Sequence, residues 1–128
     1  MDAEAWLEAY RVAWERADAE AAARLFTEDA TYRSNIFEEP HRGRSGVKTY
    51  WETVTATQSE VTVRIGRPFG GGDRVSAEFW TTMTADGAEI TLAGCLLLHF
   101  DDEGRCRSLR EYWHIGSGTS QPPPEWGT

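Results

Sequence analysis

The sequence is short of cysteine, of basic residues and of long hydrophobic runs, and each shortage narrows what the protein can be. Its two cysteines are Cys95 and Cys106. If residues 101–104 turn a hairpin, Cys95 lies opposite about Arg110, roughly four residues or ~13 Å along the strand from Cys106. That separation is too long for a disulfide bond, so we expect two free thiols.

Acidic residues outnumber basic ones, 21 to 13, and the formal net charge is −8. Nucleic acids and anionic membrane surfaces require a basic footprint on the protein, so the sequence predicts neither as a partner. No apolar run approaches the roughly 20 residues that cross a bilayer. The first ten residues, MDAEAWLEAY, are acidic and amphipathic, unlike a signal peptide. We therefore expect a cytoplasmic protein.

Aromatic residues, by contrast, are plentiful: they make up 12% of the chain and include six tryptophans. Together with a length of 128 residues and a hydrophobic fraction of 40%, they indicate one globular domain with an aromatic core or cavity. We assign residues 1–116 to this domain. Residues 117–128 contain glycine, serine and three consecutive prolines, which cannot continue a strand, and are predicted to form a flexible tail.

Three helices are predicted in the first half of the chain. Asp2 is expected to cap a helix over about residues 3–16, and Asp18 a second over about residues 19–26. Ser45 is expected to cap the third. The apolar positions of this third helix follow an i, i+3, i+4, i+7 spacing and are Val47, Tyr50, Trp51 and Val54.

Beyond the third helix the hydrophobic period changes from 3.6 to 2, which predicts strands. Residues 88–100 are nearly all apolar and are predicted to form a central strand buried on both faces. The other predicted strands are residues 27–33, 61–65, 74–84 and 105–115, with a loop at 35–46 and turns at 69–73, 86–87 and 101–104. Helices followed by strands give an α+β fold, here three N-terminal helices packed on a strongly curved antiparallel sheet that encloses a pocket.

Three segments resemble the nuclear transport factor 2-like superfamily, and in particular its SnoaL-like domains. They are ADAEAAARLFTEDATYRS, the G-x-x-G-V-x-x-Y-W pattern at residues 43–51, and HFDDEGRCRSLREYW. The resemblance covers about residues 3–116 and implies a cone-shaped fold. Polyketide cyclases, steroid delta-isomerases and limonene epoxide hydrolases belong to this superfamily, as do binders and interaction modules, so fold alone does not assign an activity.

Two known sites of the superfamily match the sequence only in part. A tyrosine that holds the oxyanion in the steroid isomerases matches Tyr10, but the positions of their base and second acid fall on Ser34 and Leu96. A tyrosine and an aspartate of the limonene epoxide hydrolases match Tyr32 and Glu111. The arginine and second aspartate of that site fall on residues without charge, Phe79 and Thr81. Neither site is complete.

These matches, with the alternation of side chains along a strand, predict which face of the last strand is inward. In the stretch LREYWHI, residues 109–115, Glu111 and Trp113 would face the pocket and Tyr112 the outside. A turn at 101–104 would place Glu111 opposite Gly94 and Leu109 opposite Leu96. The predicted pocket-facing residues are Tyr10, Trp14, Tyr32, Ser34, Trp51, Phe79, Thr81, Met83, Leu96, Leu98, Glu111 and Trp113.

Glu111 is the strongest catalytic candidate. Between apolar neighbours its pKa would rise toward neutrality, which suits a proton donor or acceptor, while Tyr32 would orient the substrate. The alternative is a hydrated glutamate, or one paired with Arg33 or Arg110. The loop at residues 38–44 is either a lid that brings His41 to the site or, more simply, a solvated loop.

The sequence thus predicts that a small, mostly apolar and even polycyclic molecule binds in the cavity. Proton transfer by Glu111 would then support cyclisation, isomerisation or dehydration, without a cofactor. Metal binding is not expected, because His41, His99 and His114 lack the spacing of ligands. The alternatives are a non-catalytic binder and a dimeric interaction module whose cavity its own tryptophans fill. The resemblance implies a homodimer formed through the outer sheet face.

Overall fold

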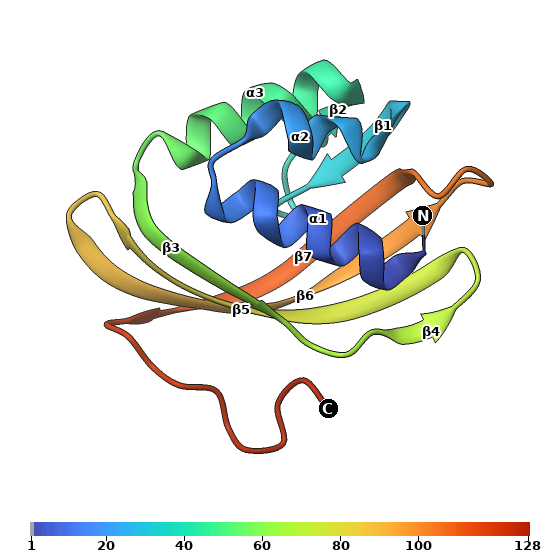
Figure 1. Ribbon diagram of the computed structural model, residues 1–128. Helices are drawn as coiled ribbons and strands as arrows, with labels where there is room; N and C mark the ends of the chain where they lie inside the picture. Colours follow the sequence, from blue (N-terminus) through green and yellow to red (C-terminus); the bar gives the residue numbers. More distant parts are fainter. Residues whose placement is uncertain (1) are drawn as a thin grey trace.

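The computed structural model describes residues 2–128, in which three helices lie on one face of a curved sheet (Figure 1). The helices are α1 (Ala3–Glu15), α2 (Ala19–Arg24) and α3 (Gly43–Thr55). Asp2 caps α1 by accepting a hydrogen bond from the Ala5 amide at 2.7 Å, and Asp18 caps α2 by accepting one from Ala21 at 3.0 Å. Both predicted caps are therefore confirmed.

The third helix begins two residues before the predicted cap. Arg42 stands at the N-cap position and its side chain makes no capping hydrogen bond, so the assignment of Ser45 is wrong. The helix begins earlier because a short strand, β2 (His41–Arg42), lies within the predicted loop. It pairs with β1 (Phe26–Arg33) and is followed at once by α3.

The remaining strands are β3 (Gln58–Ile65), β4 (Phe69–Gly71), β5 (Arg74–Ala85), β6 (Ala88–Phe100) and β7 (Cys106–Ser117). The sheet order is β2-β1-β7-β6-β5-β3, with β4 paired to β5. The α+β class is confirmed, but the sheet is mixed rather than wholly antiparallel, because β1 runs parallel to β7. Helix α3 and the hairpins lie between these two strands in sequence, and a long connection of that kind allows parallel pairing.

The β6–β7 hairpin is longer at its turn than predicted. Glu111 pairs with Leu96, and Gly94 pairs with Trp113, so the predicted register is wrong by two residues. Two features cause the shift. Arg105 belongs to the turn and not to β7, and the register is irregular between His99 and Phe100. Each feature adds one residue on the β7 side of the hairpin. A shift of two preserves side-chain alternation, so Glu111 stays on the predicted face.

Strand β6 is central, between β5 and β7, but it is not buried on both faces. Its inward residues Leu96, Leu98 and Phe100 are buried, whereas the outward residues between them are half-buried. None of the three helices in residues 2–128 covers the outer face (Figure 1). Both cysteines are free, as predicted, and Cys95 pairs with Tyr112 across the ladder.

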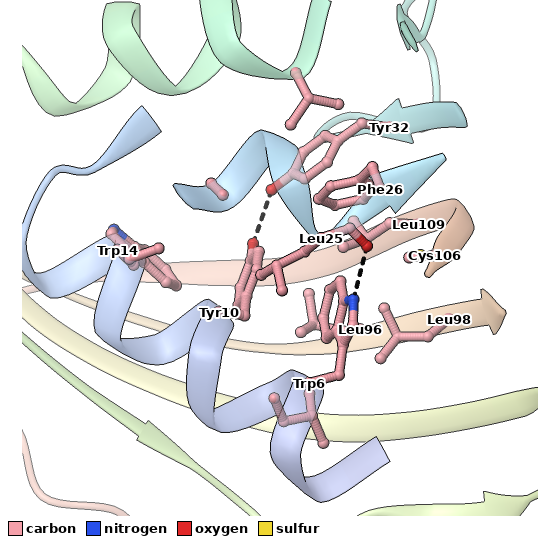
Figure 2. Packing of buried hydrophobic residues seen from close by; sticks show 14 of the residues in the cluster. Trp6, Tyr10, Trp14, Leu25, Phe26, Tyr32, Leu96, Leu98, Cys106 and Leu109 are labelled. Carbon is pink, nitrogen blue, oxygen red and sulfur yellow. Dashed lines mark hydrogen bonds between the residues drawn. The ribbon is translucent and has the colours of Figure 1, made fainter. Parts of the chain in front are cut away.

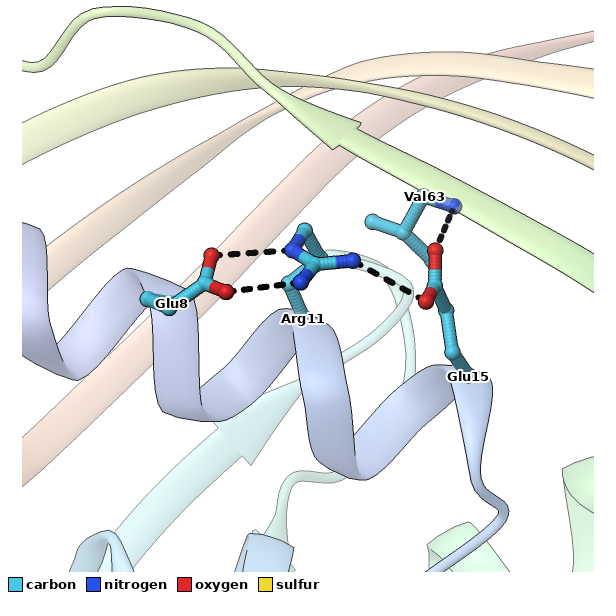
Figure 3. A network of polar contacts seen from close by, with 4 residues as sticks. All are labelled: Glu8, Arg11, Glu15 and Val63. Carbon is cyan, nitrogen blue, oxygen red and sulfur yellow. Dashed lines mark hydrogen bonds and ion pairs between the residues drawn. The ribbon is translucent and has the colours of Figure 1, made fainter.

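An aromatic core joins α1 to the sheet (Figure 2). Trp6 stacks on Tyr10 with ring centroids 5.3 Å apart, and its indole nitrogen donates to the carbonyl of Leu25 at 2.9 Å. A polar network along α1 ties the same helix to the edge strand β3 (Figure 3). There Glu15 accepts from Arg11 at 2.9 Å and from the Val63 amide at 2.8 Å.

The C-terminal segment, residues 118–128, returns beneath the sheet on the face away from the helices (Figure 1). The Trp126 ring stands edge-on to Trp80 at 6.0 Å, and the Arg64 guanidinium lies 5.3 Å from the Trp126 ring. The backbone of this segment also bonds to the rest of the protein, since the Arg67 amide donates to the Gly127 carbonyl at 2.9 Å. Flexibility of this tail stays a prediction. Within residues 2–128, no helix combines the length and apolarity needed to cross a membrane.

Candidate functional site

A cavity of about 350 Å³ lies between the helices and the inner face of the sheet. Helices α1 and α3, strands β3, β5, β6 and β7, and the loop after β1 all contribute to its wall. The lining residues are Trp14, Ser34, Asn35, Glu38, Tyr50, Trp51, Val54, Gln58, Phe79, Leu92, Glu111 and Trp113. The wall is therefore mostly aromatic and aliphatic, with a few polar groups, which is the usual character of a small-molecule site.

Glu111 is the deeply buried carboxyl of this wall, with 7% of its surface exposed. The hydroxyls of Tyr32 and Tyr50 both donate to its Oε1 atom, at 3.2 and 3.4 Å. Tyr32 in turn lies 2.9 Å from the hydroxyl of Tyr10, which extends the network into the core (Figure 2). Two tyrosines, from β1 and α3, therefore bond to one carboxyl, and a third, from α1, bonds to the first of them.

No arginine, lysine or histidine of residues 2–128 forms an ion pair with Glu111. Arg33, one of the two partners considered from sequence, donates instead to the Glu38 carbonyl at 2.8 Å. Arg110, the other, is exposed and lies on the opposite face of β7.

Burial without a cation raises the pKa of Glu111 to about 8, and the hydrogen bonds from Tyr32 and Tyr50 oppose that rise. Burial also raises the pKa of Tyr10, Tyr32 and Tyr50, and the nearby Glu111 carboxylate raises all three further. The tyrosines therefore stay protonated as donors at neutral pH. Glu111 changes its protonation state near neutrality, as a group that both gives and takes protons must.

Six of the residues predicted to face the pocket line this cavity: Trp14, Ser34, Trp51, Phe79, Glu111 and Trp113. Tyr32 touches the site through its hydrogen bond to Glu111. The other predicted residues lie in the packed core without lining the cavity, and they are Tyr10, Thr81, Met83, Leu96 and Leu98. Trp113 stands at the rim, 43% exposed, with its indole nitrogen donating to the Ser34 carbonyl at 2.8 Å.

Sequence reasoning did not place Tyr50 in the site. By its spacing Tyr50 is one apolar position of the third helix, next to Trp51, which is predicted to face the pocket. Two neighbouring helical residues lie about 100° apart, so both can border one wide cavity, and this was the available signal. His41 is half-buried, and its ring lies against that of Tyr50, with centroids 4.5 Å apart and planes inclined at 36°, so it is not simply part of a solvated loop.

Two buried polar atoms near the site have no hydrogen-bond partner within the described chain: Nε1 of Trp51 and Oγ1 of Thr81. Gln58, which lines the cavity, accepts from the Trp14 indole at 3.1 Å through its side-chain oxygen, so its amide nitrogen is not used in this hydrogen bond. Residues 2–128 contain no group of three or more His, Cys, Asp or Glu side chains placed to hold a metal ion.

Three solved structures share the fold. SalBIII, an epoxide hydrolase/cyclase-like enzyme described in pyran ring formation in polyether salinomycin, has a TM-score of 0.78 and 22% identity over 89% of this chain and 94% of its own. A protein of ketosteroid isomerase-like fold from Catenulispora acidiphila, in complex with trimethylamine, has a TM-score of 0.77 and 24% identity over 88% of this chain and 86% of its own.

The third structure, from Shewanella denitrificans, is described as a SnoaL-like polyketide cyclase. It has a TM-score of 0.75 and 14% identity over 87% of this chain and 89% of its own. Among curated proteins, none matches the chain. The SnoaL-like domain model matches residues 4–109, which confirms the resemblance drawn from sequence. This chain therefore belongs to the SnoaL-like domain family, with the cone fold of the nuclear transport factor 2-like superfamily.

Proposed function

We propose that the protein binds a small, mostly apolar molecule in the cavity and transfers a proton on it, with Glu111 as the acid/base. The observation that carries the proposal is the Glu111 carboxyl, buried among aromatic rings and held by two tyrosine hydroxyls without a cation. Cyclisation, isomerisation and dehydration all need a group that exchanges a proton near neutral pH.

In its acid form Glu111 donates a proton to a ligand oxygen, and in its base form it removes a proton from carbon or from a hydroxyl. Tyr32 and Tyr50 stabilise the carboxylate that results, because both hydroxyls already donate to Oε1. The aromatic wall excludes water and strengthens these interactions. The reaction needs no further cofactor, because each proton that Glu111 gives is recovered in a later step.

The solved relatives support a small-molecule role for this fold. SalBIII is described in ring formation, and the Catenulispora protein was solved with trimethylamine. Binding without turnover is the second candidate function. The mostly aromatic and aliphatic lining of the cavity supports it, because such a wall binds apolar molecules whether or not a proton is transferred.

Two probe substrates test the proposal: a steroid β,γ-unsaturated ketone for isomerisation and an epoxy alcohol for cyclisation. Glu111→Gln should lower turnover by about 100-fold or more. Glu52→Gln is the matched control, because Glu52 is an exposed residue of α3 outside the cavity lining. A Glu111→Gln protein that retains full turnover removes Glu111 from the mechanism. Binding of both probes with conversion of neither favours the non-catalytic function.

We also propose a homodimer through the outer face of the sheet. Tyr112, exposed by 45% at the centre of that face, supports it. Residues 118–128 already cover β3, β5 and the start of β6 on the same face, so the second copy would contact β7 and the rest of β6.

A further inference from the structure

The charges that line the cavity are of one sign. Two carboxyls, Glu38 and Glu111, border it, and no arginine, lysine or histidine of the described residues does. Two basic side chains of neighbouring segments have other contacts: Arg33 donates to the Glu38 carbonyl, and the His41 ring lies against the Tyr50 ring. A buried carboxyl normally has a charged partner or becomes neutral. Here the protein supplies no partner.

Aromatic rings surround the same space. Trp14, Tyr50, Trp51, Phe79 and Trp113 all line it. Their planes are steeply inclined to one another: Trp14 and Trp51 meet at 62°, Trp14 and Phe79 at 63°, and Tyr50 and Trp51 at 77°. The ring centroids within these pairs are 5.4–5.7 Å apart, so the rings pack edge to face and form one continuous aromatic wall. The face of an aromatic ring attracts an ammonium group within about 6 Å.

We propose that the ligand of this cavity carries a cationic amine, whose ammonium group lies among the aromatic rings with Glu111 as its counter-ion. The inference rests on the proposed function in using the same cavity, and it adds the charge of the ligand. Tyr32 and Tyr50 then act as donors that hold the Glu111 carboxylate toward the cation. Gln58 offers its amide nitrogen to an oxygen elsewhere on the same molecule.

Cation binding must be coupled to the ionisation of Glu111. In the free protein burial keeps the pKa of Glu111 at about 8, so at neutral pH most molecules carry the neutral acid. A bound cation favours the carboxylate, and each binding event therefore releases a proton. Affinity for a permanent cation rises with pH and levels off above about pH 8. Tyr32 and Tyr50 also face Glu111, and burial raises the pKa of both, so they stay protonated over this range. Glu38 and His41 lie close by and are less deeply buried.

Choline and 3,3-dimethylbutan-1-ol test the proposal by isothermal titration calorimetry. The two probes have the same shape, but only choline is charged. We expect choline to bind the wild-type protein at least about tenfold more tightly at pH 8.5. We also expect proton release at pH 7, measured in two buffers of different ionisation enthalpy. Glu111→Gln should reduce the preference to the part that the aromatic rings supply and abolish the proton release, whereas Glu52→Gln should retain both in full.

Equal affinity for the two probes, or no binding of choline, overturns the amine site. Choline binding that is unchanged in the Glu111→Gln protein overturns the role of Glu111 as counter-ion. These results are separable from failure of the proposed function. If only the alcohol binds, the cavity still takes apolar molecules. If choline binds selectively and the probe substrates are not converted, the amine site stands without catalysis.

Discussion

The hydroxyl of Tyr32 lies 3.2 Å from Oε1 of Glu111, which joins the parallel strands β1 and β7 through their side chains. The two residues are 79 positions apart in the chain. Tyr50 donates to the same oxygen from α3 at 3.4 Å. The protonation of Glu111 is therefore controlled by elements from both halves of the sequence.

Tyr32→Phe, which removes the Tyr32 hydroxyl, should raise the pKa of Glu111 above about 8. The reason is that the carboxylate loses a hydrogen bond that stabilises it. Tyr50→Phe should raise it less, since its hydrogen bond is the smaller influence. Carbon-13 NMR titration of labelled glutamate, assigned by comparison with Glu111→Gln, measures the shift. Tyr112→Phe on the outer face is the control, and an equal rise there would refute the assigned role of Tyr32.

Stability should fall as pH rises, because of Glu111. Its folded pKa of about 8 exceeds its ordinary value of 4.5, so the folded state binds the proton more tightly than the unfolded state. The stabilisation is complete below about pH 4.5 and is lost as pH rises through about 8, by about 5 kcal/mol at most. Glu111→Gln should remove this fall. Urea unfolding at pH 6 and pH 8.5 tests it, with Glu52→Gln expected to follow the wild type.

Glu15→Ala should destabilise the protein by about 1.5–3 kcal/mol, because Val63 would lose a hydrogen bond to a charged acceptor. This bond joins α1 to β3, an edge strand that has only β5 beside it along the main sheet order. Urea unfolding measures the change. Glu8→Ala, which removes only the exposed partner of Arg11 (Figure 3), should cost much less. Equal losses in the two variants would contradict a specific role for the contact with Val63.

Trp126→Ala should leave the homodimer dissociation constant within about threefold of the wild-type value, because Trp80 and Arg64, which it uncovers, lie on β5 and β3 and not on the strands proposed to contact the second copy. Tyr112→Ala should weaken the dimer, since it trims the uncovered part of that face. Sedimentation equilibrium over a range of concentrations provides both dissociation constants. A weaker dimer in the Trp126→Ala protein would show instead that residues 118–128 form part of the interface.

The local structure could be predicted where short-range chemistry decides it. Asp2 and Asp18 cap helices because aspartate accepts backbone hydrogen bonds, and Asp86-Gly87 turns a hairpin because both residues adopt positive φ. The third helix was located by its apolar spacing, but its start was not, because β2 pairs with β1 over a distance that no local pattern reports.

The site could be predicted only in part. The alternation of LREYWHI placed Glu111 on the inner face, since a two-residue register shift does not change parity. The partners of Glu111 could not be read from the chain. Tyr50 and Tyr32 meet it through the packing of α3 and the parallel pairing of β1 with β7.

By itself the sequence determined the α+β class, the SnoaL-like resemblance and the inward direction of Glu111, because periodicity, capping and strand alternation act over a few residues. Only the tertiary structure decided that this carboxyl is buried with three tyrosines and without a cation. Burial and the distance between charges depend on segments far apart in the chain, and these two quantities fix the pKa of Glu111 and the chemistry that it offers.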